Sequence, residues 1–85
     1  MTIKEYYSQL KTADDLMSNH LHNKLSVVLQ NVIPLVKDSK QKKELKNFHR
    51  KCEELSFANI GTEEYIEVRR ITYEVFEFIE DNLIN

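Results

Sequence analysis

The sequence predicts an all-α fold, a small antiparallel four-helix bundle, and three observations lead to this prediction. The 85 residues include a single Gly and a single Pro, too few for the turns of β-hairpins. Apolar residues recur at helical spacing in four successive segments. The connections between these segments are short, which makes neighbouring helices run in opposite directions. With no internal repeat or linker, residues 1–85 are expected to form a single helical domain.

Two capping patterns define the first helix and the start of the second. Thr2 and Glu5 form a T-x-x-E capping box, which predicts a helix over residues 3–11. Thr12 and Asp15 repeat the pattern, and Asp14 and Asp15 suit the positive end of a new helix. The sequence therefore predicts a break at Thr12 and a second helix over residues 13–34.

Residues 16–36 contain the longest apolar periodicity and are expected to form the central helix. The apolar members of one broad arc are Met17, Leu21, Leu25, Val28, Leu29, Val32, Ile33, Leu35 and Val36. The polar residues expected to face away from it are Asn19, Asn23, Ser26 and Gln30. Pro34 lacks a backbone N–H and should end this helix within a turn.

The third and fourth helices are predicted over residues 40–58 and 63–83. Asp38 or Ser39 caps the third, whose apolar seam consists of Leu45, Phe48, Cys52 and Leu55. Gly61 closes this segment, and Thr62 caps the last helix. The apolar residues of the last helix include Tyr65, Val68, Ile71, Val75, Phe76, Phe78, Ile79 and Leu83, with Ile66, Tyr73 and Ile84 as a second wing. This sector is wider than one neighbouring helix covers, so we expect it to contact two helices or another molecule.

Composition places the chain among water-soluble intracellular proteins. Apolar residues make up 41% and charged residues 31%, which is too apolar for disorder and too interrupted for a membrane span. The N-terminus has no apolar run of the kind found in signal peptides, so we expect a cytoplasmic protein. Cys52 is alone, which excludes an internal disulfide. The residue usage suggests a bacterial or phage source.

Charge is divided between two regions, although the net charge is only -2. Residues 37–51 are strongly basic, whereas the chain from Thr62 onward is mostly acidic. The basic face of the third helix is a candidate site for an acidic protein partner, and its residues are Lys40, Lys42, Lys43, Lys46 and Arg50. Phosphates are the alternative ligand. The acidic total charge and the scarcity of Arg argue against nucleic acid.

The last helix offers a second candidate surface, for a partner or for a homodimer. Its candidate residues are Tyr65, Arg69, Tyr73, Phe76 and Glu80. Arg69 and Glu80 project in nearly the same direction between two apolar wings, so Arg69 must extend to water, form an ion pair or contact a partner. The outward carboxylates of this helix are expected to pair with the basic helix or to repel wrong partners.

A histidine-containing segment is the remaining candidate for chemistry. His20, His22, Asn23 and Leu25 occur in the order H-L-H-N-K-L, which resembles the phospho-accepting helix of two-component histidine kinases and phosphotransfer proteins. This resemblance implies that His22 accepts a phosphoryl group with Asn23 beside it. His20 and His22 are two residues apart and point in opposite directions, so the spacing opposes a shared metal. We expect no metal and no cofactor.

The leading functional hypothesis is a small non-enzymatic interaction protein that regulates or inhibits a cytoplasmic partner through its helix surfaces. The sequence contains no Ser-His-Asp order, phosphate-binding loop or CxxC pair. Charge-segregated helical bundles of this size are typical of accessory proteins of phages, plasmids and bacteria, such as inhibitors, antiholin-like regulators and immunity proteins. A histidine phosphotransfer-like module and a nucleic-acid-binding accessory protein are the alternatives. The sequence leaves the partner, the organism and the oligomeric state open.

Overall fold

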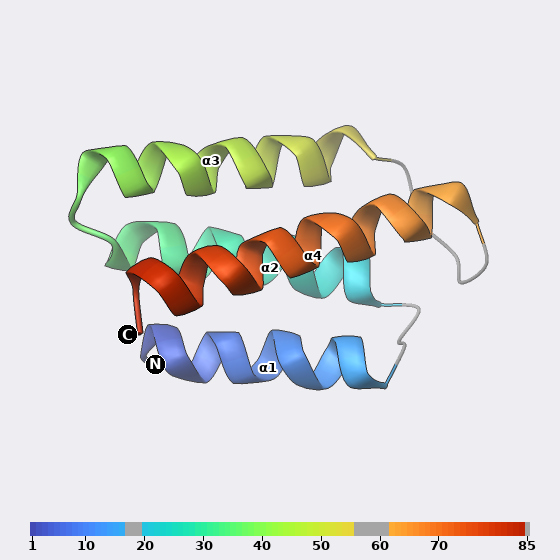
Figure 1. Cartoon of the computed structure of the whole chain (residues 1–85), viewed down its shortest axis with the longest axis horizontal. Coiled ribbons are helices and arrows are strands. Elements are labelled where there is room, and N and C mark those ends of the chain that lie inside the picture. Colours follow the sequence, from blue (N-terminus) through green and yellow to red (C-terminus); the bar gives the residue numbers. More distant parts are fainter. Residues whose placement is uncertain (17–19, 56–61, 85) are drawn as a thin grey trace.

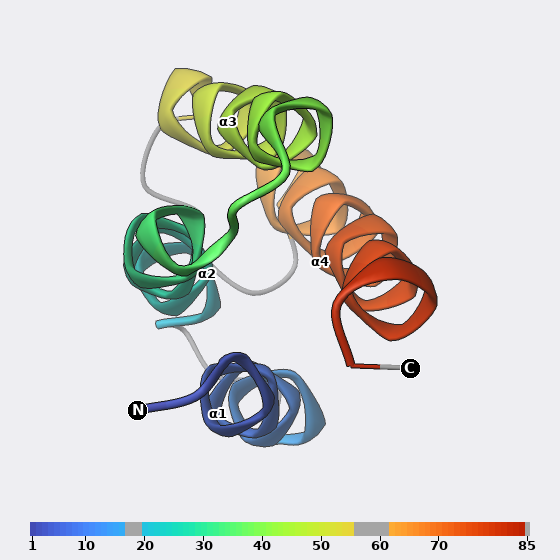
Figure 2. The same cartoon turned by 90° about the vertical axis from the view of Figure 1, so that its left-hand side faces the viewer.

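Four α-helices in the order of an antiparallel bundle make up the fold. The computed structural model describes residues 1–16, 20–55 and 62–84. Its helices are α1 (Ile3–Asp15), α2 (Leu21–Val32), α3 (Ser39–Glu54) and α4 (Glu63–Asn82), and a 3-10 turn, η1 (Ile33–Leu35), follows α2. Chain direction alternates from each helix to the next (Figure 1), and the four helices surround a common core (Figure 2). The predicted fold class is confirmed.

Helices α2 and α4 are the central pair of the bundle. Each contacts the other, and each also contacts both α1 and α3. The wide apolar sector of the last helix is thereby explained, because α4 packs against three helices. The side chains that are fully buried in this core are Leu10, Leu21, Leu25, Val28, Leu29, Val32, Leu45, Cys52, Val68, Thr72, Val75 and Ile79.

Three of the predicted helix caps are confirmed by hydrogen bonds. The Glu5 amide donates to the Thr2 hydroxyl at 3.2 Å, and the Thr2 amide donates to the Glu5 carboxylate at 2.9 Å, which completes the capping box. The hydrogen bond that the Thr2 amide donates to the carboxylate is the main cause of a lowered pKa of Glu5. The Gln41 amide donates to Asp38 at 2.9 Å, and the Tyr65 amide donates to the Thr62 hydroxyl at 3.2 Å. Local sequence therefore fixes the start of three helices.

The predicted break at Thr12 is wrong. Helix α1 continues through Thr12 to Asp15, and α2 begins at Leu21 rather than at residue 13. The Thr12 hydroxyl donates to the Ser8 carbonyl one turn earlier, at 3.0 Å, instead of capping a new helix. Helix α3 ends at Glu54. Residues 56–58 of the predicted third helix lie outside the described residues.

The predicted faces of the central stretch are mostly correct, with two exceptions. Ser26 is only 8% exposed although it was expected to face solvent, and Leu35 is 44% exposed although it was expected in the core. Pro34 lies in η1 directly after α2 and ends the α-helix as predicted. Met17 and Asn19 lie outside the described residues.

Candidate functional site

The basic face of α3 lies on the outside of the bundle. Lys40, Lys43, Lys46 and Arg50 are exposed, and Lys42 is half-buried. The core residues of the same helix, Leu45 and Cys52, are on the opposite side. Lys40, Lys43, Lys46 and Arg50 therefore lie on the part of α3 that faces away from the core, and Lys42 lies at its edge.

Ion pairing of the basic face is confined to Arg50 among the described residues. Arg50 donates to Glu54 at 2.8 Å on its own helix, but within the described part of the chain the four lysines form no ion pair. The expected pairing of the acidic last helix with the basic helix is not found among those residues. Glu67 and Glu74 instead pair with Arg70 of α4, at 2.7 and 3.6 Å, and the hydrogen bond that Arg70 donates to Glu67 raises the pKa of Arg70.

The basic face consists of two rows along α3. Lys42, Lys46 and Arg50 follow one another at intervals of four residues and lie on the side of α2. Lys40 lies on the side of α4, and Lys43 lies opposite the buried seam, between the two sides. A depression of about 310 Å³ between α3 and α4 shows this placement, because Lys40 and Glu44 line it together with Phe78 and Asn82.

The candidate residues of α4 divide into buried and exposed ones. Tyr65 and Phe76 are each 4% exposed and belong to the core. Arg69 is half-buried, and Tyr73 and Glu80 are exposed. A molecule that binds this side of α4 would therefore contact the exposed residues rather than Tyr65 and Phe76.

Arg69 forms an ion pair, which is one of the three outcomes expected for it. Its Nε donates to Asp14 Oδ1 at 3.3 Å, and its guanidinium lies 5.3 Å from the Tyr73 ring centre and donates to the Tyr73 hydroxyl. Desolvation lowers the pKa of Arg69, but the charge of Asp14 and the other favourable interactions outweigh it and raise the pKa. Asp14 is itself buried. The pair connects the end of α1 to α4.

A second polar contact connects the start of α1 to the end of α4. The Tyr7 hydroxyl donates to the Glu80 carboxylate, and this hydrogen bond, together with burial, raises the pKa of Tyr7 to about 12. The Tyr7 ring meets Phe76 edge-on at 5.4 Å, and Lys11 Nζ lies 4.7 Å from the Phe76 ring centre. Arg69 and Glu80, two of the predicted candidate residues of α4, therefore hold both halves of α1 against α4.

His22 joins α2 to the last turn of α3. Its Nε2 lies 2.8 Å from the Cys52 carbonyl oxygen, and the Cys52 thiol donates to the His22 carbonyl at 3.7 Å. Because a carbonyl only accepts hydrogen bonds, Nε2 carries the proton here and has no lone pair free to attack phosphorus. Burial raises the pKa of the Cys52 thiol to about 12. In this arrangement His22 gives the Cys52 carbonyl, near the end of α3, a second hydrogen bond beside the one from the Leu55 amide.

A polar cluster beside His22 was not found from the sequence. The Ser26 hydroxyl donates to the Glu53 carboxylate, His49 Nε2 lies 3.4 Å from the same carboxylate oxygen, and Gln30 Nε2 lies 3.3 Å from His49 Nε2. The Ser26 hydroxyl and the Glu53 carboxylate thus both lie near Nε2 of His49, whereas a catalytic triad needs the carboxylate at Nδ1. The sequence signal that could have predicted this cluster is the i, i+4 spacing of Ser26 with Gln30 and of His49 with Glu53.

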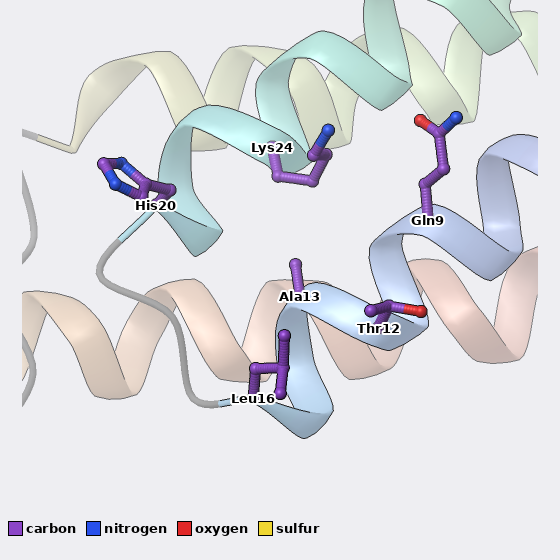
Figure 3. A pocket seen from close by; sticks show the side chains of 6 residues that line it. All are labelled: Gln9, Thr12, Ala13, Leu16, His20 and Lys24. Carbon is purple, nitrogen blue, oxygen red and sulfur yellow. The ribbon is translucent and has the colours of Figure 1, made fainter.

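A depression of about 430 Å³ lies between the C-terminal half of α1 and the first turn of α2 (Figure 3). Its lining combines apolar, amide, hydroxyl and basic side chains: Gln9, Thr12, Ala13, Leu16, His20 and Lys24. Elsewhere in the core the buried Tyr65 hydroxyl has no hydrogen-bond partner among the described residues. No group of three or more potential metal ligands occurs in residues 1–16, 20–55 and 62–84.

None of the helices in the described ranges is both long enough and apolar enough to cross a bilayer. Comparison of the chain with protein-family models, with curated proteins and with solved structures found no match.

Proposed function

We propose that this chain is a small, non-enzymatic cytoplasmic protein that regulates or inhibits a partner protein by binding it through helix surfaces. The observation that carries the proposal is the row of Lys42, Lys46 and Arg50 on the outside of α3. Two of its three cations have no ion-pair partner among the described residues. A partner with carboxylates at matching spacing would gain charge-assisted contacts there.

The side chains with reactive chemistry support a binding role rather than catalysis. His22 Nε2 donates to a backbone carbonyl, and the Ser26, His49 and Glu53 side chains contact one another. The Cys52 thiol is fully buried with a raised pKa, which opposes formation of the thiolate nucleophile. These groups hold α2 to α3, and the uncompensated charge lies outside.

The acidic residues of the same molecule favour a protein partner over nucleic acid. Glu77, Glu80 and Asp81 are exposed at the end of α4. This end and the start of α3 lie at the same end of the bundle (Figure 1), where Lys40 and Asn82 line one depression. A polyanion that followed the basic face would also approach these carboxylates, whereas a folded protein with a local acidic patch avoids them.

Affinity capture with charge-reversed variants tests the proposal. The wild-type chain and the K42E/K46E variant are immobilised and exposed to an extract of the source organism, and bound proteins are quantified by mass spectrometry. We expect the main bound protein to fall at least about tenfold with K42E/K46E, because two like-charge contacts replace two favourable ones.

The matched control is K4E/K24E, which changes the net charge by the same amount on α1 and α2. It should retain the bound protein. Equal capture by the wild type and K42E/K46E, or equal loss with K4E/K24E, would show that the row of α3 is not the binding surface.

A further inference from the structure

The polar cluster between α2 and α3 brings electron-pair donors of both helices together. It consists of Ser26 and Gln30 of α2 with His49 and Glu53 of α3. The members of each pair are one helical turn apart and therefore share a face of their helix. Ser26 is buried, His49 is half-buried, and Gln30 and Glu53 are exposed. The cluster is therefore open to solvent on one side, where an ion can reach it.

The two contacts of the His49 ring nitrogen do not fit a single proton. Its Nε2 lies 3.4 Å from Glu53 Oε1 and 3.3 Å from the Gln30 amide nitrogen. Both separations are longer than the roughly 2.7 to 3.2 Å of good N–H···O hydrogen bonds. Nε2 needs a proton to donate to the carboxylate and must lack one to accept from the amide. In this arrangement one of the two contacts is therefore unfavourable.

A half-turn of the Gln30 amide replaces its nitrogen by its oxygen at the same place. His49 Nε2, Glu53 Oε1 and Gln30 Oε1 then approach one another as three electron-pair donors. The edges of a tetrahedron around a zinc ion with bonds of about 2.0 to 2.1 Å measure about 3.3 to 3.4 Å. The two separations from His49 Nε2, 3.4 and 3.3 Å, match these edges.

We propose that His49, Glu53 and Gln30 bind a divalent transition-metal ion of the zinc class, with water as the fourth ligand. Imidazole nitrogen and carboxylate oxygen are both common ligands of zinc. The Ser26 hydroxyl donates to the Glu53 carboxylate and orients it from the buried side. Because the ligands come from two helices, the bound ion links α2 to α3.

The charges and ligand types around the site make it weaker than a structural zinc site. Glu53 supplies negative charge, but Lys46 lies one turn before His49 on α3 and opposes a cation. Arg50 donates to Glu54 on the same helix. Nowhere in the described ranges do three His, Cys, Asp or Glu side chains come together, so the third protein ligand is an amide oxygen.

The site is independent of the earlier expectations for this chain. The expectation of no metal rested on the spacing of His20 and His22, and the proposed site uses neither. It also needs no partner protein, whereas the proposed function depends on the row of Lys42, Lys46 and Arg50. The two proposals therefore fail separately.

Titration of the chain with Co²⁺ tests the inference, because Co²⁺ replaces zinc and its visible spectrum distinguishes tetrahedral from octahedral coordination. One equivalent should give a tetrahedral spectrum, which Zn²⁺ should abolish by displacement. His49→Ala and Glu53→Gln should each weaken Co²⁺ binding at least about tenfold. Excess Zn²⁺ should raise the urea midpoint of the wild type but not that of these two variants.

The matched controls are His20→Ala and Glu54→Gln, which remove the same two chemical groups outside the cluster. Both should bind Co²⁺ like the wild type, and circular dichroism should show that every variant is folded. A wild type that leaves Co²⁺ octahedral overturns the inference, as does undiminished binding by Glu53→Gln or an equal loss in Glu54→Gln. A thiolate-to-Co²⁺ absorption band in the near ultraviolet would assign the ion to Cys52 and equally overturn it.

Discussion

The contact of α1 with α4 and the contact of α2 with α3 both contain buried or half-buried polar groups, but they hold the helices in different ways. In the first contact, Arg69 forms an ion pair with Asp14, and the Tyr7 hydroxyl donates to the Glu80 carboxylate. In the second contact the donors are neutral: His22 donates to the Cys52 carbonyl, and the Ser26 hydroxyl donates to the Glu53 carboxylate. Loss of Arg69 leaves the buried Asp14 carboxylate without its cation, whereas loss of His22 leaves a neutral carbonyl that keeps its hydrogen bond from Leu55.

The largest effect is expected from Arg69→Met at the contact of α1 with α4. The substitution keeps the length of the side chain and leaves the Asp14 carboxylate, which is 8% exposed, without its cation. We expect the free energy of unfolding to fall by about 2 kcal/mol, measured by urea denaturation. Arg70→Met is the control and should change stability little, because Arg70 is exposed on the same helix. Equal losses in the two variants would contradict the importance of the pair.

An intermediate effect is expected from His22→Phe at the contact of α2 with α3. The aromatic ring is kept, but the donor to the Cys52 carbonyl is lost. The carbonyl still accepts from the Leu55 amide at 3.2 Å, so the loss should be about 1 kcal/mol in the same urea assay. The control Asn23→Ala, at the exposed residue after His22, should leave the free energy of unfolding unchanged. A loss larger than that of Arg69→Met would reverse the comparison between the two contacts.

The smallest effect is an alkaline loss of stability at the contact of α1 with α4. The pKa of Tyr7 is raised from 10.0 in the unfolded chain to about 12 in the folded one, so the folded state holds this proton more tightly. The stabilisation is complete below pH 10 and disappears as pH rises through 12. The urea concentration at the unfolding midpoint should therefore be lower at about pH 11 than at about pH 8.

The Tyr7→Phe variant should show a smaller alkaline decrease than the wild type, and Tyr6→Phe should behave like the wild type. Part of the decrease should remain in Tyr7→Phe, because the raised pKa of the Cys52 thiol acts in the same direction. If the urea midpoint of Tyr7→Phe decreased at alkaline pH as much as that of the wild type, Tyr7 would not be a cause of the decrease.

Local patterns in the sequence predicted most of the fold. The caps at Thr2, Asp38 and Thr62 depend on hydrogen bonds within three residues, and all three are found in the structure. The start of α2 was misplaced because Thr12 and Asp15 also match a capping pattern. The competing interaction is the ion pair of Asp14 with Arg69, which is 55 residues away and invisible to local pattern analysis.

The candidate sites could be predicted only in part. The basic face follows from helical spacing, because residues opposite a buried seam must face solvent. Tyr65 and Phe76 were assigned to a surface because the width of an apolar sector does not reveal how many helices cover it. Ser26 was assigned to solvent because a hydroxyl looks like a surface residue until its partners, His49 and Glu53, are known.

Cys52 gives the molecule an intrinsic reporter. It is the single thiol of the chain, it is fully buried between α2 and α3, and its side chain cannot meet an alkylating reagent while those helices stay together. The rate of thiol labelling under native conditions therefore measures how often this half of the bundle opens. Labelling that is faster than global unfolding would show that α3 detaches while the other helices remain folded.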